Sequence, residues 1–130
     1  MKIKYRISKD KRCREINDFI QKEFPHLLKE KKPDLILVSG GDGAILHAIQ
    51  EYNHFKAPFF GYGTGNLNFL MNELDLNKLK KLLIKIESDK VSLRTIVTKK
   101  ISVKIQKAKS KKVIKVGQSV NEVVLGSKLM

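Results

Sequence analysis

The segment Gly40-Gly41-Asp42-Gly43 places one carboxylate among three glycines, between an apolar run and a helical pattern. Backbone N–H groups in such a loop can bind an anion near the positive end of the helix, and glycine lets a phosphate approach because it has no Cβ. A carboxylate would repel a bare phosphate, so Asp42 would instead accept a hydroxyl proton or hold a metal that bridges phosphates. A tight turn in which Asp42 only caps the helix is the structural alternative.

A second glycine-rich loop, Gly63-Thr64-Gly65-Asn66, follows the short apolar segment Pro58 to Tyr62. Neither loop fits the G-x-x-x-x-G-K-[ST] pattern of a P-loop ATPase or the G-x-G-x-x-G pattern of a dinucleotide dehydrogenase, so both classes lack their defining feature. One cysteine and three scattered histidines form no zinc-binding pattern. We therefore expect the chemistry at the two glycine-rich loops.

Strands and helices alternate in the part of the sequence that contains these loops. The predicted strands span 2–8, 35–38 and 58–62, and the predicted helices span about 13–24, 44–52 and 76–86. The run Leu35 to Val38 is apolar on both faces, as in a central parallel strand, while Pro25 stops the first helix and Asp75 can cap the third. This order predicts an α/β fold: a Rossmann-like parallel sheet flanked by helices, with a ligand crevice at the carboxyl ends of the strands.

The pattern changes near Val91, beyond which no helical period recurs. Four short β-rich runs follow, at 91–97, 101–105, 113–116 and 120–125, separated by lysine pairs and a turn-like segment at 108–112. These runs predict the opening strands of an antiparallel β domain. We therefore expect an α/β domain over residues 1–97 and the start of an incomplete β domain over residues 98–130.

Composition indicates a globular chain, since 42% of the residues are apolar and no apolar run approaches the roughly 20 residues of a membrane span. The N-terminus alternates charged and apolar residues, unlike a secretion signal. Cys13 is the only cysteine, which fits a reducing compartment. Together these features favour a cytoplasmic location without membrane association.

Positive charge is the strongest compositional signal, because 27 lysines and arginines against 13 acidic residues give a net charge of +14. Only four of the 27 are arginines, the preferred readers of bases and phosphates, and the lysines are spread along the chain. A solvated lysine surface is therefore favoured over a nucleic-acid interface. Steering of a phosphate-bearing ligand by part of this charge is the alternative.

Three segments, taken together, resemble the NAD kinase family. Gly40-Gly41-Asp42-Gly43 resembles the GGDG signature that NAD kinases share with diacylglycerol kinases. The segment 61–70, GYGTGNLNFL, is similar to the G-x-x-x-G-x-L-G-F-L segment of the NAD kinase branch, and Asn121-Glu122 resembles its N-E motif. The three segments occur in the family's order, and the resemblance covers almost the whole chain.

The resemblance implies a nucleotide-binding domain that transfers a phosphoryl group from ATP, or from polyphosphate, to the 2′-hydroxyl of the adenosine ribose of NAD, giving NADP. Asp42 would be the catalytic base, and Mg²⁺ or another divalent cation would accompany ATP, although the sequence identifies no metal ligand directly. The implied phosphate-binding residues are Gly40, Gly41, Gly43, Gly63 and Gly65. The implied NAD-binding residues are Asp42, Gly43, His47, Phe69, Leu70, Asn121 and Glu122. The family also implies a homo-oligomer for the intact protein.

Several positions depart from the family pattern. Ala44 replaces the threonine that commonly follows GGDG, His47 replaces an arginine or lysine, and Asn68 replaces a glycine. Asparagine is among the few residues that tolerate positive φ. A second glycine/threonine-rich motif, which completes the NAD site in family members, does not occur before Met130, so we expect this chain to correspond to the first part of such a kinase.

Two other functions stay open at this point. One is a lipid kinase of the diacylglycerol or sphingosine type, because Gly63-Thr64-Gly65-Asn66 also resembles the GTGN of that branch. That branch usually places its N-E directly after GGDG, where this sequence has Ala44 to His47. The other is a truncated, non-catalytic module that binds nucleotide, or RNA through its lysines.

Overall fold

The computed structural model describes residues 1–6, 11–63, 70–73, 75–92, 101–106 and 113–119, and the statements below concern these residues. The chain divides into two compact units, residues 1–95 and 96–130, and each unit is described by itself. The division into an α/β domain over 1–97 and a β domain over 98–130 stays a prediction.

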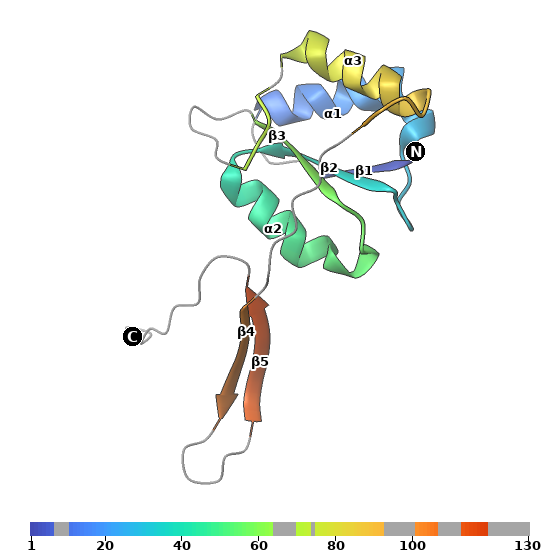
Figure 1. Ribbon diagram of the computed structural model, residues 1–130. Helices are drawn as coiled ribbons and strands as arrows, with labels where there is room; N and C mark the ends of the chain where they lie inside the picture. The colour runs from blue at the N-terminus through green and yellow to red at the C-terminus, as the bar shows by residue number, and fades with distance from the viewer. Residues whose placement is uncertain (7–10, 64–69, 74, 93–100, 107–112, 120–130) are drawn as a thin grey trace. The chain divides into compact units, whose positions relative to one another are not determined.

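The first unit contains a three-stranded parallel sheet with helices on both faces. The strands are β1 (Ile3–Arg6), β2 (Leu35–Gly40) and β3 (Phe59–Gly63), in the order β1-β2-β3. The helices are α1 (Lys11–Glu23), α2 (Asp42–Tyr52) and α3 (Leu76–Glu87), with short 3₁₀ turns η1 (Pro25–Leu27) and η2 (Asn53–Phe55). Figure 1 shows α1 and α3 on one face of the sheet and α2 on the other. The predicted parallel α/β fold is confirmed.

The central strand β2 divides the hydrophobic core into two clusters. Every residue of β2 is buried, and Leu35 and Leu37 pack towards α1 and α3 while Ile36 and Val38 pack towards α2. The first cluster consists of Ile3, Ile16, Ile20, Phe24, Leu27, Leu35, Leu37, Tyr62, Leu79, Leu83 and Ile86. The second consists of Ile36, Val38, Ile45, Ala48 and Met71. A strand buried on both faces has no polar side, which explains the uninterrupted apolar run from Leu35 to Val38.

The helix ends follow local sequence signals. Helix α1 ends at Glu23, just before Pro25, and the carboxylate of Asp75 accepts the Lys78 N–H at 2.7 Å as the N-cap of α3, so both predicted boundaries are confirmed. Helix α2 begins at Asp42 with Gly41 as its N-cap. The alternative in which Asp42 is the capping residue is therefore wrong. Among the described helices, none has the length and apolarity of a membrane span.

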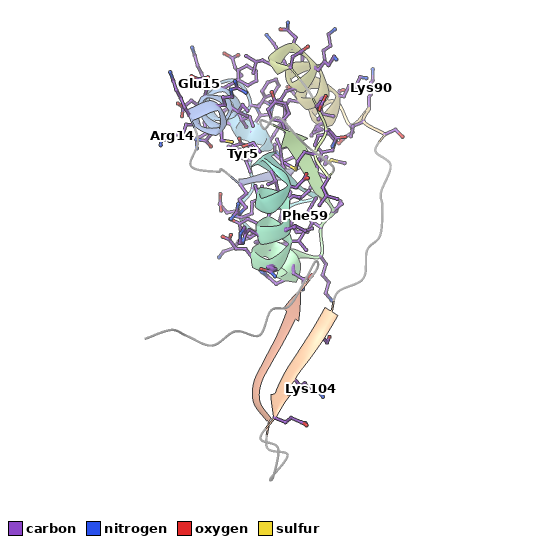
Figure 2. The ribbon with its side chains drawn as sticks, turned by 90° about the vertical axis from the view of Figure 1, so that its left-hand side faces the viewer. Tyr5, Arg14, Glu15, Phe59, Lys90 and Lys104 are labelled. Atoms are coloured by element: carbon purple, nitrogen blue, oxygen red, sulfur yellow. The ribbon has the colours of Figure 1, made fainter. Side chains whose placement is uncertain are left out.

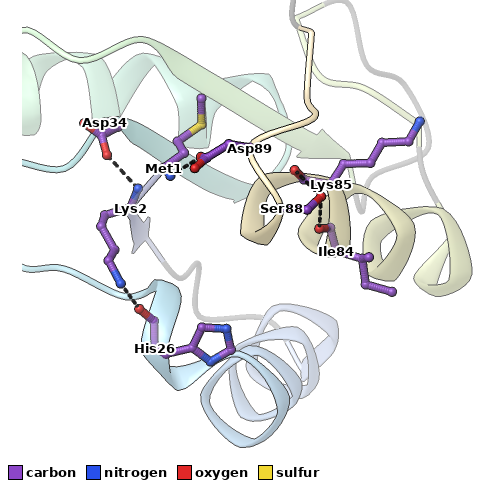
Figure 3. A network of polar contacts seen from close by, with 8 residues as sticks. All are labelled: Met1, Lys2, His26, Asp34, Ile84, Lys85, Ser88 and Asp89. Atoms are coloured by element: carbon purple, nitrogen blue, oxygen red, sulfur yellow. Dashed lines mark hydrogen bonds and ion pairs between the residues drawn. The ribbon is translucent and has the colours of Figure 1, made fainter.

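Polar contacts join the chain at the amino end of the sheet (Figure 3). The N-terminal ammonium group lies 2.6 Å from Asp89 Oδ1, and the backbone N–H of Lys2 donates to Asp34 Oδ2 at 2.6 Å. The Lys2 ammonium group also donates to the carbonyl of His26. These groups are exposed, so each contact contributes little to stability, but together they join β1, η1, β2 and α3 at the end of the sheet opposite the glycine-rich loops.

The second unit contains an antiparallel pair, β4 (Ile101–Gln106) and β5 (Val113–Ser119), with Ile101 opposite Ser119 and a register shift between Ile105 and Gln106. The predicted antiparallel pairing of these two runs is confirmed. The other two predicted runs, 91–97 and 120–125, lie outside the described residues except for Val91 and Ser92, which belong to no strand.

Candidate active site

The two glycine-rich segments begin side by side at the carboxyl edge of the parallel sheet. In the β2–β3 register, Ser39 is opposite Tyr62 and Gly40 is opposite Gly63. The carboxyl ends of parallel strands meet at one edge of a sheet, and ligands of open α/β sheets bind there. Figure 1 shows α2 starting from this edge, directly after β2. The sheet therefore brings together loops that are separated in the sequence.

Backbone geometry explains the glycines of the first loop in two ways. Gly40 has φ 139°, a conformation that L side chains rarely adopt, so the turn out of β2 requires glycine. At Gly41 and Gly43, by contrast, an added Cβ would meet no heavy atom of the described residues within 4 Å. Packing among the described residues therefore does not need glycine at these two positions. Open space over the backbone at a helix N-terminus is what a closely approaching anion requires.

Asp42 connects the start of α2 to the chain that returns from the second loop. It is the first residue of α2 and partly buried, so its carboxylate lies in the first turn, where the helix dipole favours negative charge. Its Oδ1 accepts the backbone N–H of Leu70 at 2.9 Å. The carboxylate is therefore held at the edge of the sheet by a backbone donor from another segment.

The returning segment, Leu70 to Asn72, runs alongside β3. The backbone of Asn72 donates to the Gly61 carbonyl at 2.8 Å and accepts the Gly63 N–H at 2.9 Å, which forms a parallel bridge opposite Tyr62. The side-chain amide of Asn72 donates to the same Gly61 carbonyl at 2.9 Å. Both ends of the second loop are thus fixed to the sheet, at Gly63 and at Asn72.

A buried polar contact supports the first loop from below. Ser39, the residue before Gly40, is completely buried, and its hydroxyl lies within hydrogen-bond distance of the Tyr5 hydroxyl. The Tyr5 hydroxyl also donates to the backbone carbonyl of Cys13 at 3.3 Å. Figure 2 shows Tyr5 between the sheet and α1. This contact joins β1, β2 and the first turn of α1 beneath the turn that leads to Asp42.

Tyr62, opposite Ser39 in the sheet, is buried near the same edge. Burial raises the pKa of its phenol above the usual value of 10.0, and the negative charge of Asp75 adds to this effect. The positive charge of Arg12, in the first turn of α1, acts in the opposite direction. Tyr62 therefore keeps its phenol proton at physiological pH.

The structure brings together some of the predicted site residues and does not describe others. Those near the carboxyl edge are Gly40, Gly41, Asp42, Gly43, Gly63 and Leu70. His47 lies further along α2 and is exposed, as is the side chain of Leu70. The predicted residues Gly65, Phe69, Asn121 and Glu122 lie outside the described residues, and their roles stay predictions.

The sequence did not identify Asn72, and for Leu70 it predicted a contact with NAD. The structure shows Leu70 contacting Asp42 through the backbone N–H. Every residue except proline has this donor, so no residue type in the sequence could indicate the contact. For Asn72 the only available signal was its position shortly after a glycine-rich loop, where asparagine commonly forms local hydrogen bonds.

Within the described ranges, no three histidine, cysteine, aspartate or glutamate side chains gather as a metal site would require. Mg²⁺ in nucleotide sites typically uses one or two carboxylates together with phosphate oxygens and water. Asp42 is a partly buried carboxylate in the glycine-rich loop, and its chemistry suits such a ligand.

The chain is an open parallel α/β protein with a glycine-rich, carboxylate-containing loop at the carboxyl edge of the sheet, which is the edge where such folds bind their ligands. A family model described as "ATP-NAD kinase N-terminal domain" matches residues 2–91 of the chain. The chain belongs to the NAD kinase family.

Relatives named NAD kinase occur in Rickettsia species. The protein of Rickettsia peacockii (strain Rustic) is 44% identical over 72 residues, which are 55% of this chain and 27% of that protein. The protein of Rickettsia akari (strain Hartford) is 45% identical over 60 residues, 46% of this chain and 24% of that protein. The protein of Rickettsia bellii (strain OSU 85-389) is 50% identical over 46 residues, 35% of this chain and 18% of that protein. The matched part of this chain thus spans about a quarter of the first two relatives.

Proposed function

We propose that this chain is the part of an NAD kinase that contains the catalytic base. The reaction would transfer a phosphoryl group from ATP, or from polyphosphate, to the 2′-hydroxyl of the adenosine ribose of NAD. Membership of the family and the relatives named NAD kinase support this assignment. Because the aligned region covers only 27% of the first relative, the activity of the whole enzyme is part of the proposal.

In the proposed mechanism, Asp42 accepts the proton of the ribose 2′-hydroxyl as the oxygen attacks the transferred phosphorus. The new O–P bond forms while the bond between this phosphorus and the leaving phosphate oxygen breaks, so NADP, ADP and a proton result. Backbone N–H groups of the Gly40 to Gly43 turn bind phosphate oxygens at the positive end of α2. When bound with ATP, Mg²⁺ would neutralise charge on the phosphate oxygens.

One observation carries the proposal: Asp42 lies at the N-terminus of α2 between two glycines whose missing Cβ atoms leave open space. This arrangement allows a phosphate to approach the backbone next to a carboxylate that can accept a proton. Phosphoryl transfer depends mainly on such positioning and on charge stabilisation. The arrangement therefore suits transfer of a phosphoryl group to an alcohol.

The remaining parts of the site are proposed from the family resemblance. His47, Phe69, Leu70, Asn121 and Glu122 would contact NAD, and Gly63 and Gly65 would contact phosphate. The exposed side chain of Leu70, 53% accessible, offers apolar surface for a base or a ribose next to Asp42. The homo-oligomer expected for the family belongs to the same proposal, as does the use of Mg²⁺ or another divalent cation.

The test measures NADP formed from NAD and ATP with Mg²⁺, using the wild type and Asp42→Asn. Asparagine has the same shape as aspartate but accepts a proton far less readily, so we expect kcat to fall about 100-fold or more while KM for NAD changes little. Asp18→Asn, at an exposed position of α1, is the matched control and should keep wild-type turnover.

Equal turnover by the wild type and Asp42→Asn would remove Asp42 from the mechanism. A wild-type chain that makes no NADP with either ATP or polyphosphate would contradict NAD kinase activity of this chain and leave only its family membership. Phosphorylation of diacylglycerol with NAD left unchanged would instead favour a lipid kinase.

A further inference from the structure

We propose that Asn72 is a positioning residue for the catalytic base, acting through the backbone of Leu70. It would hold the exit of the second glycine-rich loop against β3, so that the Leu70 N–H fixes the orientation of the Asp42 carboxylate. The kinetic part of this inference rests on the proposed function, whereas the structural part can be tested without it.

Asn72 makes three hydrogen bonds to a single stretch of β3. Its backbone N–H and its side-chain amide both donate to the Gly61 carbonyl, at 2.8 and 2.9 Å, and its carbonyl accepts the Gly63 N–H at 2.9 Å. A carbonyl has two lone pairs, so Gly61 can accept both donors. Alanine at position 72 would keep the two backbone hydrogen bonds and lose the one made by the side-chain amide. The contribution of the side chain can therefore be tested separately from that of the backbone.

Close packing next to Asn72 strengthens the same attachment. Met71 is buried in the cluster between the sheet and α2, and its Sδ lies 2.4 Å from where a Cβ at Gly61 would be. A side chain at position 61 would force the Met71 side chain to move. Contacts with the sheet thus determine the positions of Met71 and Asn72. The position of Leu70 depends on these contacts, because Leu70 directly precedes Met71.

The contact between Leu70 and Asp42 completes the connection. Leu70 is one of the most exposed large apolar residues described, so its side chain does little to hold the segment in place. Its backbone N–H nevertheless lies 2.9 Å from Asp42 Oδ1. Asp42 is therefore positioned by two routes, through β2 and the Gly40–Gly41 turn, and through β3, Asn72 and Leu70.

This connection matters for catalysis because an aspartate side chain has three staggered χ1 positions, and only a subset can reach a given hydroxyl. A charge-assisted N–H to carboxylate bond favours one of them. Small errors in the position of a catalytic group lower the rate substantially. Loosening of Leu70 should therefore lower kcat more than it weakens substrate binding.

The experiment compares the wild type with Asn72→Ala and Asn72→Asp, with Asn77→Ala on an exposed part of α3 as the matched control. The aspartate variant keeps the size of the side chain and replaces its N–H donor by an acceptor. Asn72 is itself exposed, so we expect all variants to fold. Three quantities are measured: hydrogen exchange of the Leu70 amide, the three-bond N–Cγ coupling that reports χ1 of Asp42, and kcat with KM for NADP formation.

We expect Leu70 exchange to accelerate about tenfold and the Asp42 coupling to become averaged in both Asn72 variants, while amides of β2 keep their protection. We expect kcat to fall about tenfold with KM nearly unchanged.

Unchanged exchange and coupling in folded Asn72→Ala and Asn72→Asp would overturn the positioning role. Altered exchange and coupling with unchanged kcat would overturn its catalytic part. A wild-type chain without turnover would contradict NAD kinase activity of this chain, and exchange and coupling would still decide whether Asn72 positions Asp42.

Discussion

Asp42 Oδ1 and the backbone nitrogen of Leu70 are 2.9 Å apart, although the two residues are separated by 28 positions in the sequence. The hydrogen bond joins the first turn of α2 to the chain that returns from the second glycine-rich loop. The residue that follows the second loop in the sequence therefore contacts the carboxylate of the first loop. A shift of Leu70 or of the turn before α2 is therefore expected to change the orientation of the Asp42 carboxylate, the proposed catalytic base.

Gly43→Ala should separate the effect of a ligand from the effect of folding. Gly43 lies inside α2, and a Cβ there would meet no heavy atom within 4 Å, so alanine should raise the free energy of unfolding by about 0.5–1 kcal/mol. The same Cβ would occupy space proposed for phosphate, so the affinity for ATP should fall about tenfold or more. Urea unfolding and titration calorimetry measure the two effects.

Ala44→Gly is the matched control for this prediction, since it makes the opposite change at the next helical position. It should lower stability by about 0.5–1 kcal/mol and leave ATP affinity unchanged. If Gly43→Ala binds ATP as tightly as the wild type, the loop does not approach a phosphate at Gly43.

Gly61→Ala should destabilise the fold through the close contact with Met71. An added Cβ would lie 2.4 Å from Met71 Sδ and 3.1 Å from Ile45 Cδ1. Both neighbours are ends of flexible side chains, so we expect a loss of about 1–3 kcal/mol of unfolding free energy and a folded variant. Denaturant unfolding of the single variants and of the double variant with Met71→Ala measures the coupling.

Met71→Ala alone removes buried apolar atoms and should cost about 2–5 kcal/mol. In the double variant the clash at Gly61 is relieved, so its loss should be smaller than the sum of the single losses by about 1 kcal/mol. Strictly additive losses would show that Met71 does not determine how closely the returning chain approaches β3.

The sequence predicted elements whose signals are local and missed relationships that depend on distant backbone contacts. The apolar run at β2, Pro25 after α1 and Asp75 before α3 each specify an element or a boundary through nearby residues. The predicted start of α2 at Ala44 falls two residues after the observed start at Asp42, because the first turn includes Gly43 and glycine does not indicate a helix. Leu76, the predicted first residue of α3, is 52% exposed, so its apolar side chain does not belong to the buried face of the helix.

In the candidate site, too, local sequence signals were predictable and distant backbone contacts were not. Asp42 and its glycines stand out because the chemistry needs those residue types, and their placement at the sheet edge follows from strand order. The hydrogen bond from Leu70 and the attachment at Asn72 involve backbone groups that any sequence has. Only the three-dimensional arrangement of β3 and the returning segment reveals them.

Asp75→Ala should shorten or loosen the start of α3. The Asp75 carboxylate accepts the Lys78 N–H at 2.7 Å, and loss of such an N-cap costs about 1 kcal/mol. Thermal and urea unfolding measure the loss, and hydrogen exchange at Lys78 should accelerate. Glu73→Ala, an exposed change two residues earlier, is the control and should have little effect. Equal stability of both variants would contradict the capping role of Asp75.

Tyr62→Phe should alter the way stability depends on alkaline pH. Because burial and the Asp75 charge raise the pKa of Tyr62 above 10.0, the folded protein keeps the phenol proton at pH values where the unfolded chain has lost it. This contribution is fully present below about pH 10 and is lost as pH rises through the folded-state pKa. The wild type should therefore lose stability more steeply than Tyr62→Phe above about pH 10, while the difference between them stays constant around pH 8.

Urea unfolding of both proteins across this range measures the two slopes, and comparison of the pair cancels the contributions of lysines and other tyrosines. Parallel slopes would contradict the raised pKa, and with it the burial of the phenol beside Asp75 at the carboxyl edge of the sheet.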